Sequence, residues 1–74
     1  MEIVEINTAF IKLDQLLKWA GVADSGSMAK EMIADGIVMV NREICLQRGK
    51  KIIDGNVIEI SESDIAFTVK ANVD

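Results

Sequence analysis

The sequence predicts an α+β domain in which two short helices pack on a small, mostly antiparallel sheet. Between positions 13 and 33, apolar residues recur with the helical period of about 3.6, and after Gly36 the period changes to two. Asp54-Gly55 is a strong turn signal between two short apolar runs. The chain has 74 residues and half of them are hydrophobic, so residues 1–74 are expected to form one small domain with a thin core.

The first helix is predicted at about Lys12 to Ala20, and Gly21 ends it as a left-handed cap. Its apolar residues lie at i, i+3, i+4 and i+7, which is one face of a helix: Leu13, Leu16, Leu17 and Ala20.

The second helix begins after an N-cap at Ser25, with Asp24 as the competing choice, and ends at Gly36. Ala29, Met32 and Ile33 form its apolar stripe. The connection over residues 22–24 is short enough to force a helical hairpin or a crossed pair.

The strands are expected on both sides of this helical pair. The predicted strands are a short edge strand within Met1–Ile6, then Ile37–Val40, a return strand at Glu43–Leu46, Val57–Ile60 and Phe67–Val69. Ile52-Ile53 is an apolar pair that precedes the Asp54-Gly55 turn. Asn41-Arg42 is predicted as a tight turn and Gln47–Lys51 as a basic loop. Phe10 and Phe67 are expected in the core, and Cys45 is expected to be a buried thiol.

An ordered set of residues runs through both helices and into the sheet. It comprises Lys12-Leu13-Asp14, Leu16-Leu17, Gly21, Ser25, Ala29, Ile33, Gly36, Val38, Val40-Asn41, Asp54-Gly55 and Ile58. At this spacing the set resembles the S-four RNA-binding domain, also called the alpha-L motif, over about residues 11–60. Four segments are similar to the short, stand-alone bacterial members of the YaaA/YbcJ type: Leu17–Val22, Ser25-Gly26, Ala29-Lys30 and Gln47–Lys51. The resemblance implies binding to structured RNA, ribosomal or otherwise stable.

The chain departs from the family pattern at three places. Lys12 replaces an arginine, which keeps the charge but loses the planar fork of donors. Arg42 stands where the family has the glycine of an Asn-Gly turn, so a type I′ turn would impose φ > 0 on it at about 1 kcal/mol. Gly55-Asn56 replaces a late Gly-Asp.

Positive charge is concentrated in the middle of an acidic chain. The net charge is −4 overall, but residues 12–51 carry +2 and the flanks −6. Because charges more than about 10 Å apart are largely screened, a polyanion would respond to the basic middle locally. The strongest candidates for phosphate contact are Arg48, Lys50 and Lys51, on a loop whose Gly49 allows close approach; Lys18 and Lys30, off the core faces of the helices, come next, with Lys12 and Arg42 weaker.

Two further positions have competing interpretations. Ser25-Gly26 opens the second helix and offers backbone N–H groups to a phosphate, although a plain cap is the favoured interpretation. Trp19 would stack on an unpaired base or pack at the rim of the core, and packing is favoured.

The composition argues against several functional classes. There is no histidine, the one cysteine has no neighbouring base, and no zinc, Walker or EF-hand pattern occurs, so we expect no enzyme, cofactor, metal or small-molecule substrate. The single cysteine excludes an internal disulfide, and no apolar run spans a bilayer, which favours a cytoplasmic protein without membrane contact. We expect a monomer, although the sequence does not fix the oligomeric state.

Two other functional classes compete with RNA binding. Asp24-Ser25-Gly26 faintly resembles the attachment site of an acyl-carrier protein, but the strand-rich second half opposes that class. The stronger rival is a protein-binding adaptor on an S-four scaffold that no longer binds RNA.

Overall fold

The computed structural model describes residues 2–73, over which two helices and seven strands form. In chain order they are β1 (Glu2–Ile6), β2 (Phe10–Lys12), α1 (Leu13–Trp19), α2 (Gly26–Ala34), β3 (Val38–Val40), β4 (Glu43–Ile44), β5 (Lys51–Ile53), β6 (Val57–Ile60) and β7 (Ala66–Ala71).

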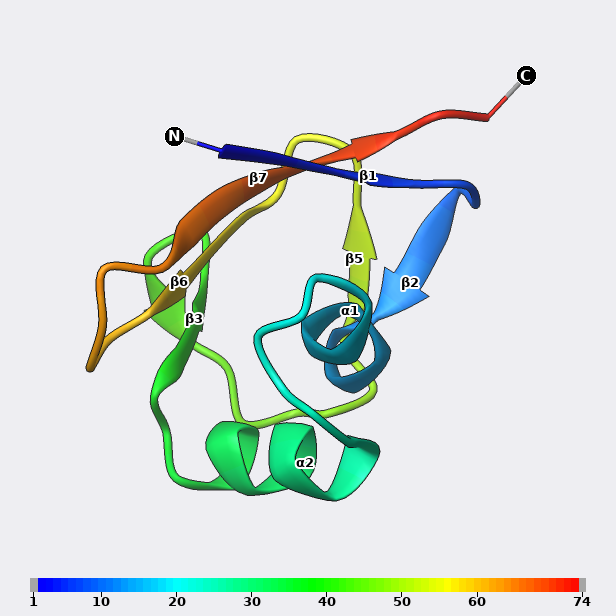
Figure 1. The fold of residues 1–74 in the computed structure, drawn as a ribbon. Helices are drawn as coiled ribbons and strands as arrows, with labels where there is room; N and C mark the ends of the chain where they lie inside the picture. The colour runs from blue at the N-terminus through cyan, green and yellow to red at the C-terminus, as the bar shows by residue number, and fades with distance from the viewer. Residues whose placement is uncertain (1, 74) are drawn as a thin grey trace.

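The strands form two sheets. The larger has the order β1-β7-β6-β3-β4, in which β1 and β7 are parallel and all other neighbours are antiparallel. The smaller is an antiparallel ribbon of β2 and β5. Figure 1 shows α1 nearly end-on beneath the lower ends of β5 and β2, with α2 running crosswise below it. The predicted α+β class is therefore confirmed, and of the two arrangements expected for the helices the crossed pair is the one that forms.

The leucine stripe of the first helix forms the centre of the core. Leu13, Leu16 and Leu17 are fully buried, and Ala29 and Ile33 of α2 are buried with them. Each buried leucine contributes roughly 1.5–3 kcal/mol through loss of apolar surface from water. The strands supply the other buried side chains of this core: Ile6, Val38, Val40, Ile52, Ile58, Ile60, Phe67 and Val69.

Both helices end as predicted, on glycines in the left-handed region. Gly21 has φ 76° and Gly36 has φ 75°. After Gly21 the Val22 N–H donates to the Leu17 carbonyl at 2.9 Å, which satisfies one of the acceptors that a helix end leaves without a partner.

The start of the first helix was predicted one residue too early. Lys12 has extended backbone angles (φ −71°, ψ 145°) and ends β2, so α1 begins at Leu13. Strand β2 was not predicted, because a three-residue strand carries too short a pattern and its partner β5 lies far along the chain. The return strand after the turn is also shorter than predicted, ending at Ile44, and Lys51 belongs to β5 rather than to the loop.

The β3–β4 turn is the strained type that the sequence raised as a possibility. Asn41 has φ 52° and Arg42 has φ 71°, both positive as a type I′ turn requires. The Asp54-Gly55 turn also forms, but it connects β5 of the ribbon to β6 of the large sheet and does not close a hairpin. Asp54 fastens that turn to β7 by accepting a hydrogen bond from the Ala71 N–H at 2.8 Å.

Two expectations about burial were wrong. Phe10 is 43% exposed, because it points outward from the narrow β2–β5 ribbon while its neighbour Ile11 points inward. Cys45 is only half-buried, and its thiol donates to the Gln47 carbonyl at a sulfur–oxygen distance of 3.6 Å. Phe67 is buried as expected.

Candidate nucleic-acid interface

The basic loop is attached to the start of α1 by its own backbone. The Leu13 N–H donates to the Lys50 carbonyl at 2.9 Å, and the Asp14 N–H donates to the Arg48 carbonyl at 3.1 Å. The side chain of Lys12, the N-cap residue, does not accept a hydrogen bond from the first turn of α1. The loop carbonyls therefore satisfy backbone N–H groups that the helix itself leaves without an acceptor. Arg48 and Lys50 are thereby held beside the first turn of α1.

The ribbon adds two lysines to the same place. In the register of β2 and β5, Lys12 lies directly opposite Lys51. Lys12, Arg48, Lys50 and Lys51, here called the basic loop cluster, are all exposed. Like charges placed opposite one another repel by roughly 0.2–1 kcal/mol, and a bound anion would relieve that repulsion.

These cations are not neutralised by neighbouring carboxylates. Within residues 2–73, none of the four forms a salt bridge. The Lys51 ammonium instead lies 4.7 Å from the centre of the Phe10 ring, a cation–π contact that leaves its donors accessible. Asp14, the nearest acid in sequence, accepts a hydrogen bond from the Gln15 N–H at 2.8 Å in the first turn of α1, where a negative charge is favourable.

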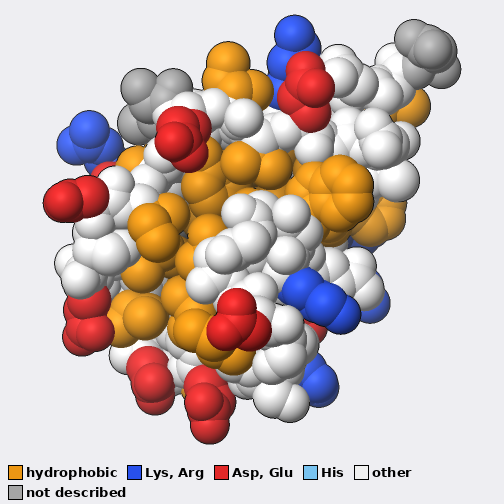
Figure 2. All heavy atoms as spheres, in the orientation of Figure 1, with side chains coloured by type: hydrophobic (Ala, Val, Ile, Leu, Met, Phe, Trp, Pro, Cys, Tyr) orange, Lys and Arg blue, Asp and Glu red, His pale blue; other side chains and the backbone are white. Residues whose placement is uncertain are grey.

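Lys18 and Lys30 lie on the helices, both exposed. The backbone hydrogen bonds that attach the basic loop to α1 involve Leu13 and Asp14, not these two lysines. Figure 2 shows Lys and Arg side chains gathered at the lower right of the molecule, over the region of α1 and the start of α2, with acidic side chains beside them. Lys18 and Lys30 are therefore exposed cations on the two helices, and no hydrogen bond joins either side chain to the basic loop cluster within the described residues.

Ser25 caps α2 as the sequence predicted. Its hydroxyl oxygen accepts a hydrogen bond from the Met28 N–H at 3.1 Å. A Cβ added at Gly26 would meet no atom within 4 Å, so nothing in the folded chain requires glycine there. Arg42 sits at the tip of the β3–β4 hairpin, in a separate element from the basic loop cluster.

Trp19 is packed at one end only. Its indole N–H donates to the Glu5 carbonyl at 2.8 Å, which fixes the ring against β1, yet the side chain is 57% exposed. With Ile11, Gln15 and Lys18 it lines a shallow hollow of about 380 Å³. Trp19 therefore packs at the rim of the core, as favoured from the sequence, and its side chain also remains largely exposed.

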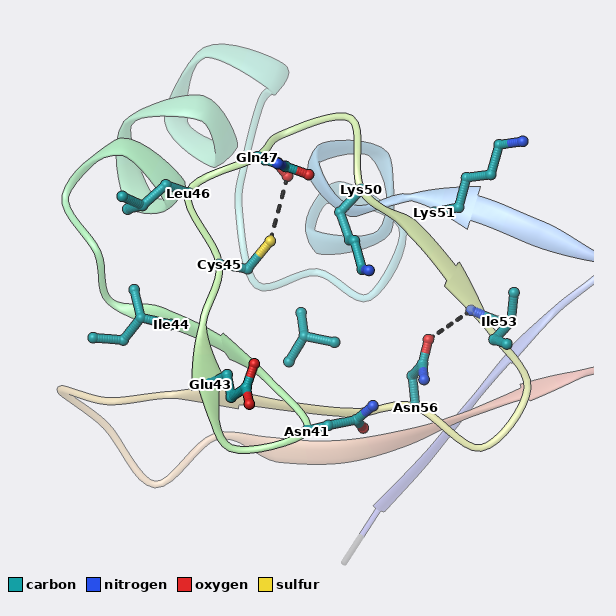
Figure 3. A pocket seen from close by; sticks show the side chains of 11 residues that line it. Asn41, Glu43, Ile44, Cys45, Leu46, Gln47, Lys50, Lys51, Ile53 and Asn56 are labelled. Carbon is teal, nitrogen blue, oxygen red and sulfur yellow. Dashed lines mark hydrogen bonds between the residues drawn. The ribbon is translucent and has the colours of Figure 1, made fainter.

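A cleft beside Lys50, larger than the hollow at Trp19, was not predicted from the sequence. Its volume is about 620 Å³, and it lies between the β3–β4 hairpin, the 45–47 segment and β5 (Figure 3). Polar side chains of Asn41, Glu43, Lys50 and Asn56 surround it. No signal in the sequence joins these residues, because they come from separate elements that meet only when the two sheets pack.

Crossed helices set against a mixed, mostly antiparallel sheet, with a loop capping the first helix, define the alpha-L class of fold. A family model for the S4 domain matches residues 4–69, and the chain belongs to the S4 domain family. The resemblance inferred from the sequence is confirmed.

The chain is similar to one curated relative and to two solved structures. The probable ribosome maturation protein RlbA of Bacillus subtilis (strain 168) is 44% identical over 57 residues, which cover 77% of this chain and 80% of that protein. The solution structure of YbcJ from E. coli, described as revealing an alpha-L motif involved in RNA-binding, superposes with a TM-score of 0.71 at 28% identity, covering 96% of this chain and 89% of YbcJ.

The 30S ribosomal protein S4e from Thermoplasma acidophilum has the same fold over a smaller part. The TM-score is 0.62 at 20% identity, and the match covers 74% of this chain but only 29% of that protein. Among the described residues, no three or more His, Cys, Asp or Glu side chains are grouped so as to hold a metal ion. None of the helices described here is both long and apolar enough to cross a membrane.

Proposed function

We propose that this chain, as a single domain over residues 1–74, is a non-enzymatic cytoplasmic protein that binds structured RNA, ribosomal or otherwise stable. The basic loop cluster contacts phosphates, and Lys18 and Lys30 extend the contact along the helices. Binding reads the shape of folded RNA more than its sequence, through phosphates and the 2′-hydroxyl-bearing groove.

One observation carries this proposal: segments far apart in sequence bring together four cations that form no salt bridge within residues 2–73. The loop carbonyls cap α1, and the β2–β5 register sets Lys12 opposite Lys51. Membership of the S4 family, the RNA-binding motif described for YbcJ and the ribosome maturation role in the name of the Bacillus relative support the choice of RNA as the anion.

The direct test is to crosslink RNA to the chain in cells and sequence what is recovered, followed by binding of the purified protein to the recovered fragment. Enrichment of ribosomal or another stable RNA is the expected result. Pulldowns with and without RNase address the adaptor alternative. Partners retained after digestion, with no RNA enriched, would replace RNA binding with protein binding on this scaffold.

A further inference from the structure

The cleft beside Lys50 presents hydrogen-bond donors in a fixed orientation. The Val57 N–H donates to Asn41 Oδ1 at 2.9 Å, and the Ile53 N–H donates to Asn56 Oδ1 at 2.9 Å. A backbone N–H requires an acceptor, so each bond assigns the oxygen of its amide and turns the NH₂ group away from the backbone. Figure 3 shows both amides at one side of the cleft, with the Lys50 ammonium extending toward them.

The remaining walls supply one acceptor and apolar surface. Glu43 of the hairpin contributes a carboxylate, and Ile44, Leu46 and Ile53 are exposed apolar side chains at its edges. The Lys51 side chain points away from the cleft, which leaves Lys50 as the cation that extends into it (Figure 3). A volume of about 620 Å³ is within the range of roughly 300–1,000 Å³ for small-molecule sites.

We propose that this cleft holds one unpaired nucleotide of the bound RNA, with a base of the keto type, uracil or guanine. The inference rests on the proposed function and adds the kind of nucleotide the site selects. The amide NH₂ groups of Asn41 and Asn56 donate to the two carbonyl oxygens of uracil or to the single carbonyl oxygen of guanine, and Lys50 contacts the adjoining phosphate.

The carboxylate of Glu43 and the two amide donors provide the selectivity together. Uracil and guanine carry a ring N–H next to a carbonyl, and that N–H donates to Glu43. Cytosine and adenine carry a bare ring nitrogen at the corresponding position, so two acceptors would face each other. Unpaired bases are the ones whose Watson–Crick edges proteins read in RNA, because a paired base does not expose that edge.

The test compares a fully paired RNA duplex with the same duplex carrying a single bulged U, G, A or C. We expect bulged U or G to bind about tenfold more tightly than bulged A or C, toward the lower end of the range for one well-formed bidentate base contact. Asn56→Asp keeps the oxygen that the Ile53 N–H needs and removes the NH₂ donor, so it should abolish that preference without unfolding the chain. Asn7→Asp, in the β1–β2 connection, adds the same charge away from the cleft and should keep the preference.

Cys45 gives a second readout, since it lines the cleft and is the chain's one cysteine. A saturating bulged-U duplex should slow alkylation of its thiol several-fold relative to the fully paired duplex. If all duplexes bind equally and alkylation is unchanged, the nucleotide site is refuted while RNA binding stands. If no RNA binds, the proposed function and the site fail together.

Discussion

The basic loop cluster and the acidic end of the molecule are built differently. The basic loop cluster is assembled from two distant segments by backbone hydrogen bonds. The acidic end, defined here as Glu2, Glu59, Glu62 and Asp64, lies around the β6–β7 turn, where Glu2 and Asp64 line one depression. Figure 1 shows that turn on the opposite side of the fold from β2.

This separation explains how an acidic protein can present a surface suited to a polyanion. The molecule measures 35 × 23 × 19 Å, so charges at opposite sides are farther apart than the screening length of about 10 Å. The net charge of −4 then discourages indiscriminate attachment to nucleic acid, while the basic loop cluster acts locally. The distribution of charge in space is therefore more informative than its sum.

The largest expected effect comes from removing the basic loop. The combined change Arg48→Ala, Lys50→Ala and Lys51→Ala should cost about 2–4 kcal/mol of RNA binding, at roughly 1 kcal/mol per lost charged contact. The fold should persist, as circular dichroism would report, because these side chains are exposed. The matched control is Glu2→Gln, Glu62→Gln and Asp64→Asn at the acidic end, which should leave binding unchanged or slightly tighter. Equal losses in both triple variants would remove the distinction between the two regions.

The salt dependence of binding sharpens the same comparison. Four to six phosphate contacts should give a log–log slope of about −3 to −5, at roughly 0.7–0.9 per contact. The basic-loop triple variant should reduce the magnitude of that slope by about 2–3, and the acidic-end variant should not change it. Titrations at several salt concentrations measure both, and a flat response in the parent chain would contradict phosphate contact.

The helical lysines test how far the basic region extends. Lys18→Ala and Lys30→Ala should each weaken RNA binding by about 1 kcal/mol or a little less, because each removes one charged contact. Lys70→Ala on β7 is the control, exposed in the sheet that carries the acidic end, and should have no effect. Fluorescence anisotropy on one RNA resolves these differences. A basic region limited to the loop would leave both helical variants at the affinity of the parent.

The smallest effect concerns the hairpin tip. Arg42→Gly should raise the free energy of unfolding by about 0.5–1 kcal/mol, because glycine adopts the observed φ of 71° with little strain. Urea denaturation measures the change. Arg42→Lys keeps both the charge and the strain, so it separates the two contributions. If the glycine variant loses RNA affinity and the lysine variant does not, the Arg42 charge belongs to the interface.

Local patterns were sufficient for much of the fold. The spacing of Leu13, Leu16 and Leu17 predicted a buried helix face, because a helix places those positions on one side. Gly21 and Gly36 marked the helix ends, since both adopt positive φ at low cost. The Asn41-Arg42 turn was also predicted, and its positive φ angles were raised as a possibility, because hairpin geometry dictates the backbone angles of the central residues.

The pairing of strands that lie far apart in the sequence could not be predicted. Strand β2 is three residues long and depends on β5, so Phe10 was wrongly assigned to the core. The attachment of the basic loop to α1 involves only backbone atoms of Arg48 and Lys50, which every residue possesses. The cleft beside Lys50 likewise arises from packing two sheets.

The amino-acid sequence by itself determined the helices, the turns, the family and the set of charged residues available for binding. Only the tertiary structure decided that Lys12 lies opposite Lys51 and that loop carbonyls hold Arg48 and Lys50 beside α1. It also decided that two asparagines lining one cleft are held there by backbone N–H groups. The physical reason is that periodicity and turn chemistry act over a few neighbouring residues. Register and packing, by contrast, join atoms whose proximity exists only after the chain has folded.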